Sequence, residues 1–215
     1  MRSLVLTRTF YQRFSRFINP LLATALIVFV VKTFVADTYR IPSDSMQPTL
    51  IDGDHVIGLK LGLMFSPPNR GEAVVIKRPD GLFYIKRMVA IYPDKIDIKT
   101  GNVIINDVEI KKQFGVDTSK YKYIDNDHAV YREFLGSSSY SVIYSGSKRP
   151  VDLLAPVKLG KQKMFILGDN RTNSIDSRQW GPISDKDVVA KPVFVWFSKD
   201  PNTGKIRWDR VGLIY

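Results

Sequence analysis

The chain has 215 residues, 44% of them hydrophobic, with a formal net charge of +11 and no cysteine. This length and apolar content allow one sizeable core, or a core with an insertion, and exclude a disordered chain. The lack of cysteine excludes a disulfide framework and a thiolate site. Because no arginine-rich run alternates with aromatic residues, we expect no nucleic-acid partner.

The first feature along the chain is an apolar stretch behind a basic segment. Residues 18–36 carry a single charge, Lys32, and as a helix they would extend about 28 Å, close to the hydrocarbon thickness of a bilayer. The arginines that precede the stretch are Arg2, Arg8, Arg13 and Arg16. The pattern predicts a basic cytoplasmic N-terminus over residues 1–16, a transmembrane signal-anchor helix over residues 17–36, and the rest of the chain across the membrane.

Two alternatives remain for this stretch. A cleaved secretory signal has a similar layout, but cleavage after Ala36 would place the large Phe34 where a small residue is wanted. The other alternative is a buried helix of a soluble protein.

The remainder of the chain is predicted to be mainly β-structure, because short β-branched or aromatic runs alternate with Gly, Pro, Asn and Asp. The clearest runs are residues 55–60, 73–77, 83–91, 103–110, 163–167 and 188–197, and Asn106-Asp107 predicts a tight hairpin turn. Residues 93–156 are richer in Lys, Asp, Tyr and Ser, which predicts an inserted, non-catalytic subdomain. Residues 37–92 and 157–215 would then form one catalytic β-core.

Ser45 is a candidate nucleophile, and histidine is the usual base for such a serine. The chain has two histidines, His55 and His128, and both lie beside acidic residues in turn-like segments. A Ser/His/Asp triad or a metal site at these positions is an open alternative, but turn chemistry and solvated surface are the simpler interpretation.

Lysine is the other base available to serine, provided that burial lowers its pKa. In the run 84–90, strand alternation places Lys86 and Arg87 on opposite faces, so one of these cations faces the core or lines a cleft. The alternative is an edge strand with both cations in solvent.

A third polar segment, residues 168–178, is crowded with Asp, Asn, Ser and Arg and follows a strand-like run. Such residues form no core, so their side chains serve turns, caps or a site. We expect Asp176 to pair with Arg178 or with Arg171 and to hold this loop in place.

Together these segments resemble the bacterial type I signal peptidases, the membrane-bound Ser/Lys endopeptidases of protein export. The motifs that carry the resemblance are Pro42-Ser43-x-Ser45-Met46-x-Pro48-Thr49, Gly53-Asp54-His55-Val56, Arg70-Gly71-Glu72-Ala73-Val74-Val75 with Tyr84-Ile85-Lys86-Arg87, and Gly168-Asp169-Asn170-Arg171 through Asn173-Ser174-x-Asp176-Ser177-Arg178. The resemblance implies a Ser/Lys signal-peptidase-type β-fold with an inserted β-rich subdomain, behind one N-terminal transmembrane helix.

The resemblance also implies a role for each matched residue. Ser45 would be the nucleophile, Lys86 the general base, and Ser43 Oγ with the Ser45 backbone N–H the oxyanion hole. Ser174 would hydrogen-bond the Lys86 amine, while Asp176 and Arg178 would brace its loop. Ile41, Met46 and Tyr84 would line shallow pockets for small side chains. Asp44 stands where glycine is common, and a carboxylate there would oppose an oxyanion unless it points away.

The function implied is removal of signal peptides from exported preproteins after small-x-small motifs, at the bacterial inner membrane. The expected partners are these signal peptides and membrane lipid, and we expect neither a metal nor a cofactor. One alternative is a specialised Ser/Lys protease that matures a pilin or a secretion-system component. Self-cleaving repressors share the Ser/Lys β-fold, but they need an upstream DNA-binding domain. The 36 basic and apolar residues at the start of this sequence leave no room for one. A non-enzymatic, membrane-tethered β-domain is the remaining alternative.

Overall fold

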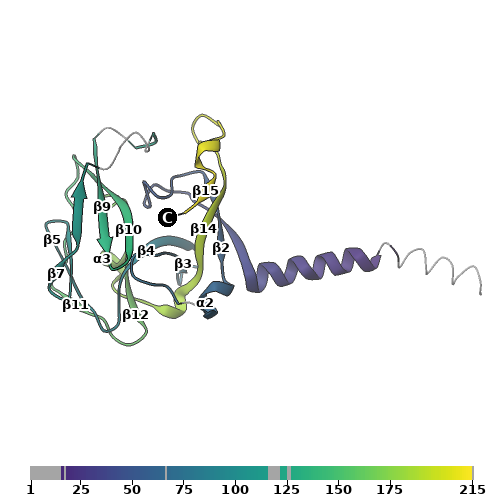
Figure 1. Ribbon diagram of the computed structural model, residues 1–215, viewed down its shortest axis with the longest axis horizontal. Coiled ribbons are helices and arrows are strands. Elements are labelled where there is room, and N and C mark those ends of the chain that lie inside the picture. Colours follow the sequence, from purple (N-terminus) through teal and green to yellow (C-terminus); the bar gives the residue numbers. More distant parts are fainter. Residues whose placement is uncertain (1–15, 17, 66, 116–121, 125–126, 215) are drawn as a thin grey trace, which may run out of the picture.

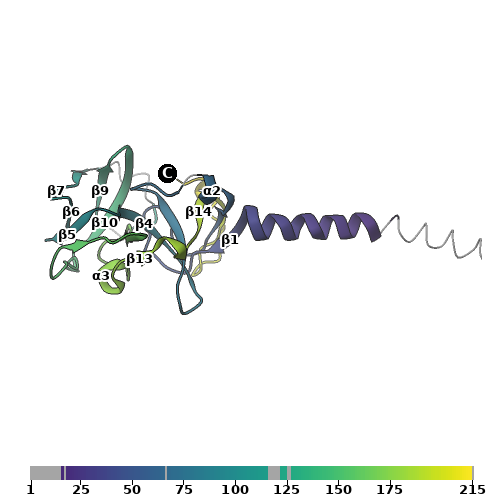
Figure 2. The ribbon, with the colours of Figure 1, turned by 90° about the horizontal axis from the view of Figure 1, so that it is seen from below.

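A computed structural model describes residues 16, 18–65, 67–115, 122–124 and 127–214 of the chain. An N-terminal helix projects from a β-rich body in both views of the ribbon (Figures 1 and 2). Residues Ile18–Val35 of this helix are long and apolar enough to cross a membrane, and none of them is buried in the protein. A buried helix of a soluble protein is therefore the wrong interpretation. The predicted basic segment lies outside the described residues, except for Arg16.

The end of this helix is fastened to the body by one lysine. The helix finishes in a π-helical turn, η1 (Val31–Val35), and strand β1 (Ala36–Arg40) begins at the next residue. The Lys60 backbone N–H donates to the Val35 carbonyl (2.8 Å), and Lys60 Nζ donates to the Lys32 carbonyl (2.6 Å) and pairs with Asp37 (3.1 Å). Carbonyls at a helix C-terminus lack intrahelical partners and favour a nearby cation, so Lys60 stabilises this junction.

The core sheet is antiparallel, with the strand order β1-β2-β14-β3-β4-β12-β13 and β15 paired to β14. Its further strands are β2 (Asp54–Leu59), β3 (Ala73–Lys77), β4 (Phe83–Ile91), β12 (Lys163–Leu167), β13 (Ile183–Ser184), β14 (Val188–Ser198) and β15 (Gly212–Leu213). The short helices are α2 (Leu61–Phe65), α3 (Ser177–Trp180), η3 (Asp185–Asp187) and η4 (Trp208–Arg210). The mainly β prediction is confirmed, and the predicted runs 73–77, 83–91 and 163–167 coincide with β3, β4 and β12.

Two smaller sheets are formed by the chain between β4 and β12, and they lie at the end of the body away from the helix (Figures 1 and 2). Their strands are β5 (Lys95–Lys99), β6 (Asn102–Ile105), β7 (Val108–Glu109) and β11 (Val157–Lys158) in one sheet, and β8 (Lys111–Phe114), β9 (His128–Leu135) and β10 (Ser138–Ser145) in the other. The turn predicted at Asn106 and Asp107 forms, with φ of 52° and 65°. The structure places Val157, which the sequence assigned to the core, opposite Ile96 of β5, where it packs with the inserted sheet.

The inserted sheets share a hydrophobic core with the core sheet. Buried Ile96 and Val142 of the insertion pack in one cluster with Val89 of β4 and Phe165 of β12. A second cluster contains Met46 and Leu50 of the loop after β1 together with core strands β2, β3, β4 and β14. The loop that carries Ser45 is thus held by apolar packing on the main sheet.

Candidate active site

The lysine and the serine proposed from the sequence meet in the structure. Lys86 lies on β4, between β3 and β12, and is 2% exposed; its Nζ is 2.6 Å from Ser45 Oγ. Burial lowers the pKa of Lys86 from 10.5 to about 8, although the carboxylates of Asp176 and Asp169 act in the opposite direction. A neutral amine is therefore available close to physiological pH, within hydrogen-bonding distance of a hydroxyl.

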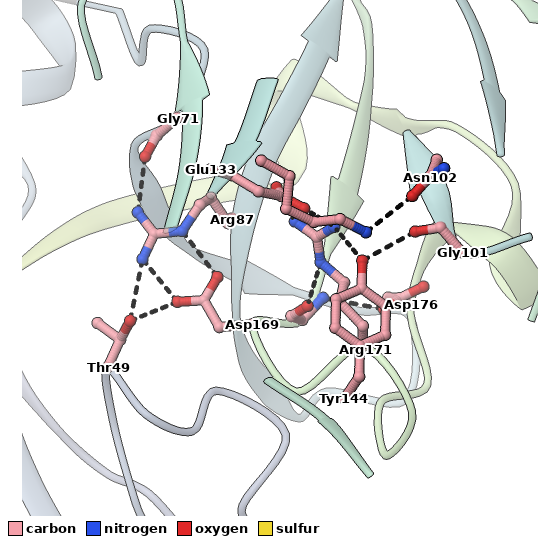
Figure 3. Close-up of polar contacts among 12 residues, drawn as sticks. Thr49, Gly71, Arg87, Gly101, Asn102, Glu133, Tyr144, Asp169, Arg171 and Asp176 are labelled. Atoms are coloured by element: carbon pink, nitrogen blue, oxygen red, sulfur yellow. Dashed lines mark hydrogen bonds and ion pairs between the residues drawn. The ribbon is translucent and has the colours of Figure 1, made fainter. Parts of the chain in front are cut away.

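The neighbouring cation, Arg87, is buried on the opposite face of the same strand. Its guanidinium forms a two-pronged pair with Asp169 (2.7 and 2.6 Å) and also donates to the Gly71 carbonyl and to Thr49 Oγ1 (Figure 3). The ring of Tyr140 lies 4.2 Å from the guanidinium carbon. The alternative of an edge strand with two solvated cations is wrong, because β4 is an interior strand. Sequence reasoning missed Asp169 as the partner of Arg87.

The hydroxyl of Ser43 lies beside that of Ser45. Its Oγ is 3.3 Å from Ser45 Oγ, and Ser43 itself is exposed. The carboxylate of Asp44, between the two serines, accepts a hydrogen bond from the backbone N–H of Asp52 (3.2 Å) and lines a different cavity on the other side of the loop. Asp44 therefore points away from the two serine hydroxyls.

A mostly apolar cleft of about 460 Å³ opens at Ser45 and Lys86. The three residues predicted to contact substrate, Ile41, Met46 and Tyr84, all line it. The cleft is also lined by six residues outside the sequence motifs, namely Asp37, Thr38, Tyr39 and Arg40 of β1 together with Leu82 and Phe83. Pairing of β1 with β2 positions the first four, and the other two lie where β4 begins.

The polar loop after β12 forms the third side of the site. Asp176 caps the N-terminus of α3 and accepts hydrogen bonds from the Gly168 backbone N–H (2.9 Å) and from Arg178 Nε and Nη2 (2.8 and 2.7 Å). Burial raises the pKa of Asp176, but the hydrogen bonds from Arg178 and Gly168 outweigh it and lower the pKa overall. Of the two partners expected for Asp176, the structure selects Arg178.

Ser174 lies beside this pair but does not make the predicted hydrogen bond to Lys86. Its Oγ is buried, and it helps to lower the pKa of Asp176 by hydrogen bonding to that carboxylate. Ser174 packs directly over Gly168, so closely that a Cβ at position 168 would lie 2.2 Å from Ser174 Oγ and 2.5 Å from the Ser45 carbonyl oxygen. The absence of a side chain at Gly168 lets the two loops approach each other.

Neither histidine is brought to the cleft. The ring of His55 packs near Trp196 and Phe197, with centroids 5.7 and 5.5 Å away. His128 lies beside Asp127 in the inserted subdomain and lines the cavity that contains Asp44. Among the described residues that line the cleft, lysine is therefore the base nearest to Ser45.

Comparison with known proteins identifies the family of the chain. A family model described as "Signal peptidase, peptidase S26" matches residues 14–197. Signal peptidase I of Buchnera aphidicola subsp. Baizongia pistaciae is 30% identical, over 88% of this chain and 80% of that protein. Signal peptidase I P of Bacillus subtilis subsp. natto is 28% identical, over 85% of this chain and 89% of that protein. Signal peptidase I of Pseudomonas aeruginosa is also 28% identical, over 88% of this chain and 75% of that protein.

The solved structure of a signal peptidase I from Enterococcus faecalis V583 aligns with a TM-score of 0.36 and 19% identity, covering 58% of this chain and 95% of that chain. Since the family model spans most of the 215 residues, the chain belongs to the bacterial type I signal peptidases of the peptidase S26 family. It is a serine endopeptidase and thus a hydrolase.

We expect Asp169→Asn to lower the free energy of unfolding by about 3–5 kcal/mol, because it leaves the buried Arg87 guanidinium without its counter-charge. Urea unfolding of the full chain in detergent measures the change. Asp107→Asn is the matched control, since Asp107 forms an exposed ion pair with Lys95 and should change stability little. Equal effects of the two substitutions would contradict this account.

We expect Gly168→Ala to lower kcat by roughly 100-fold with little effect on KM, because the new methyl group displaces the Ser45 backbone from Lys86. Kinetics with a soluble peptide substrate measure the change. Gly160→Ala is the control, because a Cβ at position 160 meets nothing within 4 Å. An unchanged kcat in Gly168→Ala would show that the close approach of the two loops is unimportant.

Proposed function

We propose that this chain is a membrane-bound signal peptidase that cleaves N-terminal signal peptides from exported preproteins after small-x-small motifs, with Ser45 and Lys86 as a catalytic dyad. The observation that carries the proposal is the 2.6 Å contact between the buried Lys86 amine and the Ser45 hydroxyl. Family membership supports the substrate class, because the matched relatives are signal peptidases.

Acylation begins when neutral Lys86 accepts the Ser45 proton as Ser45 Oγ attacks the scissile carbonyl carbon. The carbonyl oxygen gains a negative charge, which the Ser43 hydroxyl and the Ser45 backbone N–H stabilise; losing one such donor costs about 3–4 kcal/mol in other hydrolases. As the intermediate collapses, the Lys86 ammonium gives its proton to the leaving amine. An acyl ester on Ser45 remains, and the new N-terminus of the mature protein departs.

Deacylation repeats these steps with water. Neutral Lys86 removes a proton from a water molecule that attacks the ester, and the ammonium then returns a proton to Ser45 Oγ. Asp176 and Arg178 hold the loop that faces the amine. The buried Ser174 hydroxyl interacts with the Asp176 carboxylate, and Asp176 is one of the charged groups that face Lys86, which supports the proposed role of Ser174 as an orienting group for Lys86.

An extended peptide suits the cleft because one wall of the cleft is an edge strand. Strand β1 is at the end of the core sheet, and its residues Asp37–Arg40 line the cleft beside Ser45. A substrate segment can pair with such an edge and place alternate side chains in the cleft. Buried Ile41 and Met46 occupy the space beneath, which leaves shallow pockets for small side chains.

The exposed apolar helix supports attachment to the bacterial cytoplasmic membrane, with membrane lipid around the helix. The arginines before the helix favour a cytoplasmic N-terminus, which places the catalytic body on the extracytoplasmic side. A preprotein held in the same bilayer by its signal peptide reaches the cleft at a high effective concentration.

We expect Ser45→Ala and Lys86→Ala each to lower the rate of preprotein cleavage by roughly 10⁴-fold or more, since each removes one half of the acylation step. Gel analysis of a preprotein with a small-x-small site measures processing. The exposed residues Ser139 and Lys158 provide matched controls, and their alanine variants should cleave normally. Normal processing by either dyad variant would refute the assigned roles.

We expect kcat/KM to rise with pH through a midpoint of about 8, because the neutral form of Lys86 is the active one and burial lowers its pKa to that value. Below this pH the amine is protonated and the rate falls; above it the rate levels off. Initial rates with a soluble peptide, with tryptophan fluorescence to follow folding, test this. A midpoint near 10.5, the value of an ordinary lysine, would contradict the buried-base mechanism.

A further inference from the structure

The polar loop beside Lys86 also pairs with the inserted subdomain. Residue Ile143 of β10 forms a parallel bridge with Asn170: the Ile143 N–H donates to the Asp169 carbonyl, and the Arg171 N–H donates to the Ile143 carbonyl (both 2.9 Å). The Ser145 N–H donates to Thr172 Oγ1 at 2.9 Å. The loop that carries Asp176 is therefore attached along the edge of an inserted strand.

A buried ion pair joins the two parts next to this bridge. Glu133 of β9 accepts hydrogen bonds from Arg171 Nη1 (2.7 Å) and Nη2 (2.6 Å), and both side chains are 2% exposed (Figure 3). The other charged or titratable groups that face Glu133 are Lys112 of β8, and Tyr140 and Tyr144 of β10. A buried pair with this geometry contributes little net stability compared with apolar residues, but it specifies one arrangement of the groups around it.

Arg171 connects this ion pair to the residues around Lys86 and Ser45. Its backbone carbonyl accepts a hydrogen bond from Arg178 Nη1 (2.5 Å), and Arg178 in turn forms its pair with Asp176. The preceding residue, Asn170, donates its backbone N–H to the Ser45 carbonyl (3.1 Å). Glu133 is thus connected, through Arg171 and its hydrogen bond with Arg178, to the Asp176 carboxylate and, through the backbone of Asn170, to the Ser45 loop.

We propose that Glu133 is a positioning residue for catalysis, through which the inserted subdomain holds the loop of Asp176 and Arg178 against Lys86 and Ser45. This inference rests on the proposed Ser/Lys mechanism. The insertion then acts as part of the catalytic apparatus, although none of its side chains lines the cleft around Ser45 among the described residues.

Removing the charge of Glu133 has a specific catalytic consequence. In Glu133→Gln the buried Arg171 guanidinium loses its counter-charge, so the loop relaxes and water reaches the Lys86 amine. The groups that face the amine are Asp176, Asp169 and Arg178, and burial has a larger influence than any of them. Since hydration restores an ordinary lysine, the pKa of Lys86 rises from about 8.

The test compares wild type, Glu133→Gln and Glu109→Gln as full chains in detergent, with a soluble peptide substrate. Glu109 is an exposed glutamate in the same subdomain and serves as the control. For Glu133→Gln we expect kcat to fall by about tenfold or more with KM within about twofold of wild type. We also expect the midpoint of the kcat/KM profile to move to higher pH, so that the rate deficit shrinks under alkaline conditions. For Glu109→Gln we expect wild-type values.

A folded Glu133→Gln enzyme with wild-type kcat and pH midpoint would overturn the inference. If this variant does not fold, the double variant Glu133→Gln with Arg171→Gln replaces it, because two amides leave no buried charge. A folded double variant with a lower kcat and a shifted midpoint supports the inference, and wild-type values refute it. Failure of the Ser/Lys mechanism itself is seen separately, as undiminished cleavage by Ser45→Ala.

Discussion

The proposed mechanism depends on the neutral state of one buried amine. Burial lowers the pKa of Lys86 to about 8, while Asp176 and Asp169 hold it above the value that burial alone would produce. Arg87, the next residue on the strand, is equally buried but has Asp169 as a direct counter-ion and stays charged. Strand β4 therefore carries two buried cationic side chains. Arg87 has a direct counter-ion, whereas Lys86 has none and is the one suited to act as a base.

The surroundings of this amine come from three distant parts of the chain. The Ser45 loop, strand β4 and the loop at residues 168–178 each contribute a side, and the inserted sheets pack against the third of them. The contacts are polar where the loop meets the insertion and apolar beneath the nucleophile. The two kinds of contact have different effects: hydrogen-bonded ion pairs fix the orientation of the groups they join, whereas apolar packing mainly supplies stability.

Much of the core sheet could be predicted from local sequence, and the family motifs together predicted the contact between Lys86 and Ser45. The runs that became β3, β4 and β12 are dense in β-branched and aromatic residues, and strand alternation alone separates Lys86 from Arg87. The partners of buried charges could not be predicted in this way. Asp169 lies 82 residues after Arg87, and Glu133 lies 38 residues before Arg171, so their pairing depends on tertiary structure. The pairing of β11 with β5 of the insertion likewise depends on tertiary structure.

The clamp at Lys60 has a geometric consequence for a protein anchored in a bilayer. Lys60 ties the last turn of the helix to the end of β2, and β2 leads back without interruption to the Ser45 loop. In the proposed function, this link would set the height of the Ser45 hydroxyl above the lipid. A peptide bond on a chain emerging from the same bilayer would then be cut only when it is presented at that height.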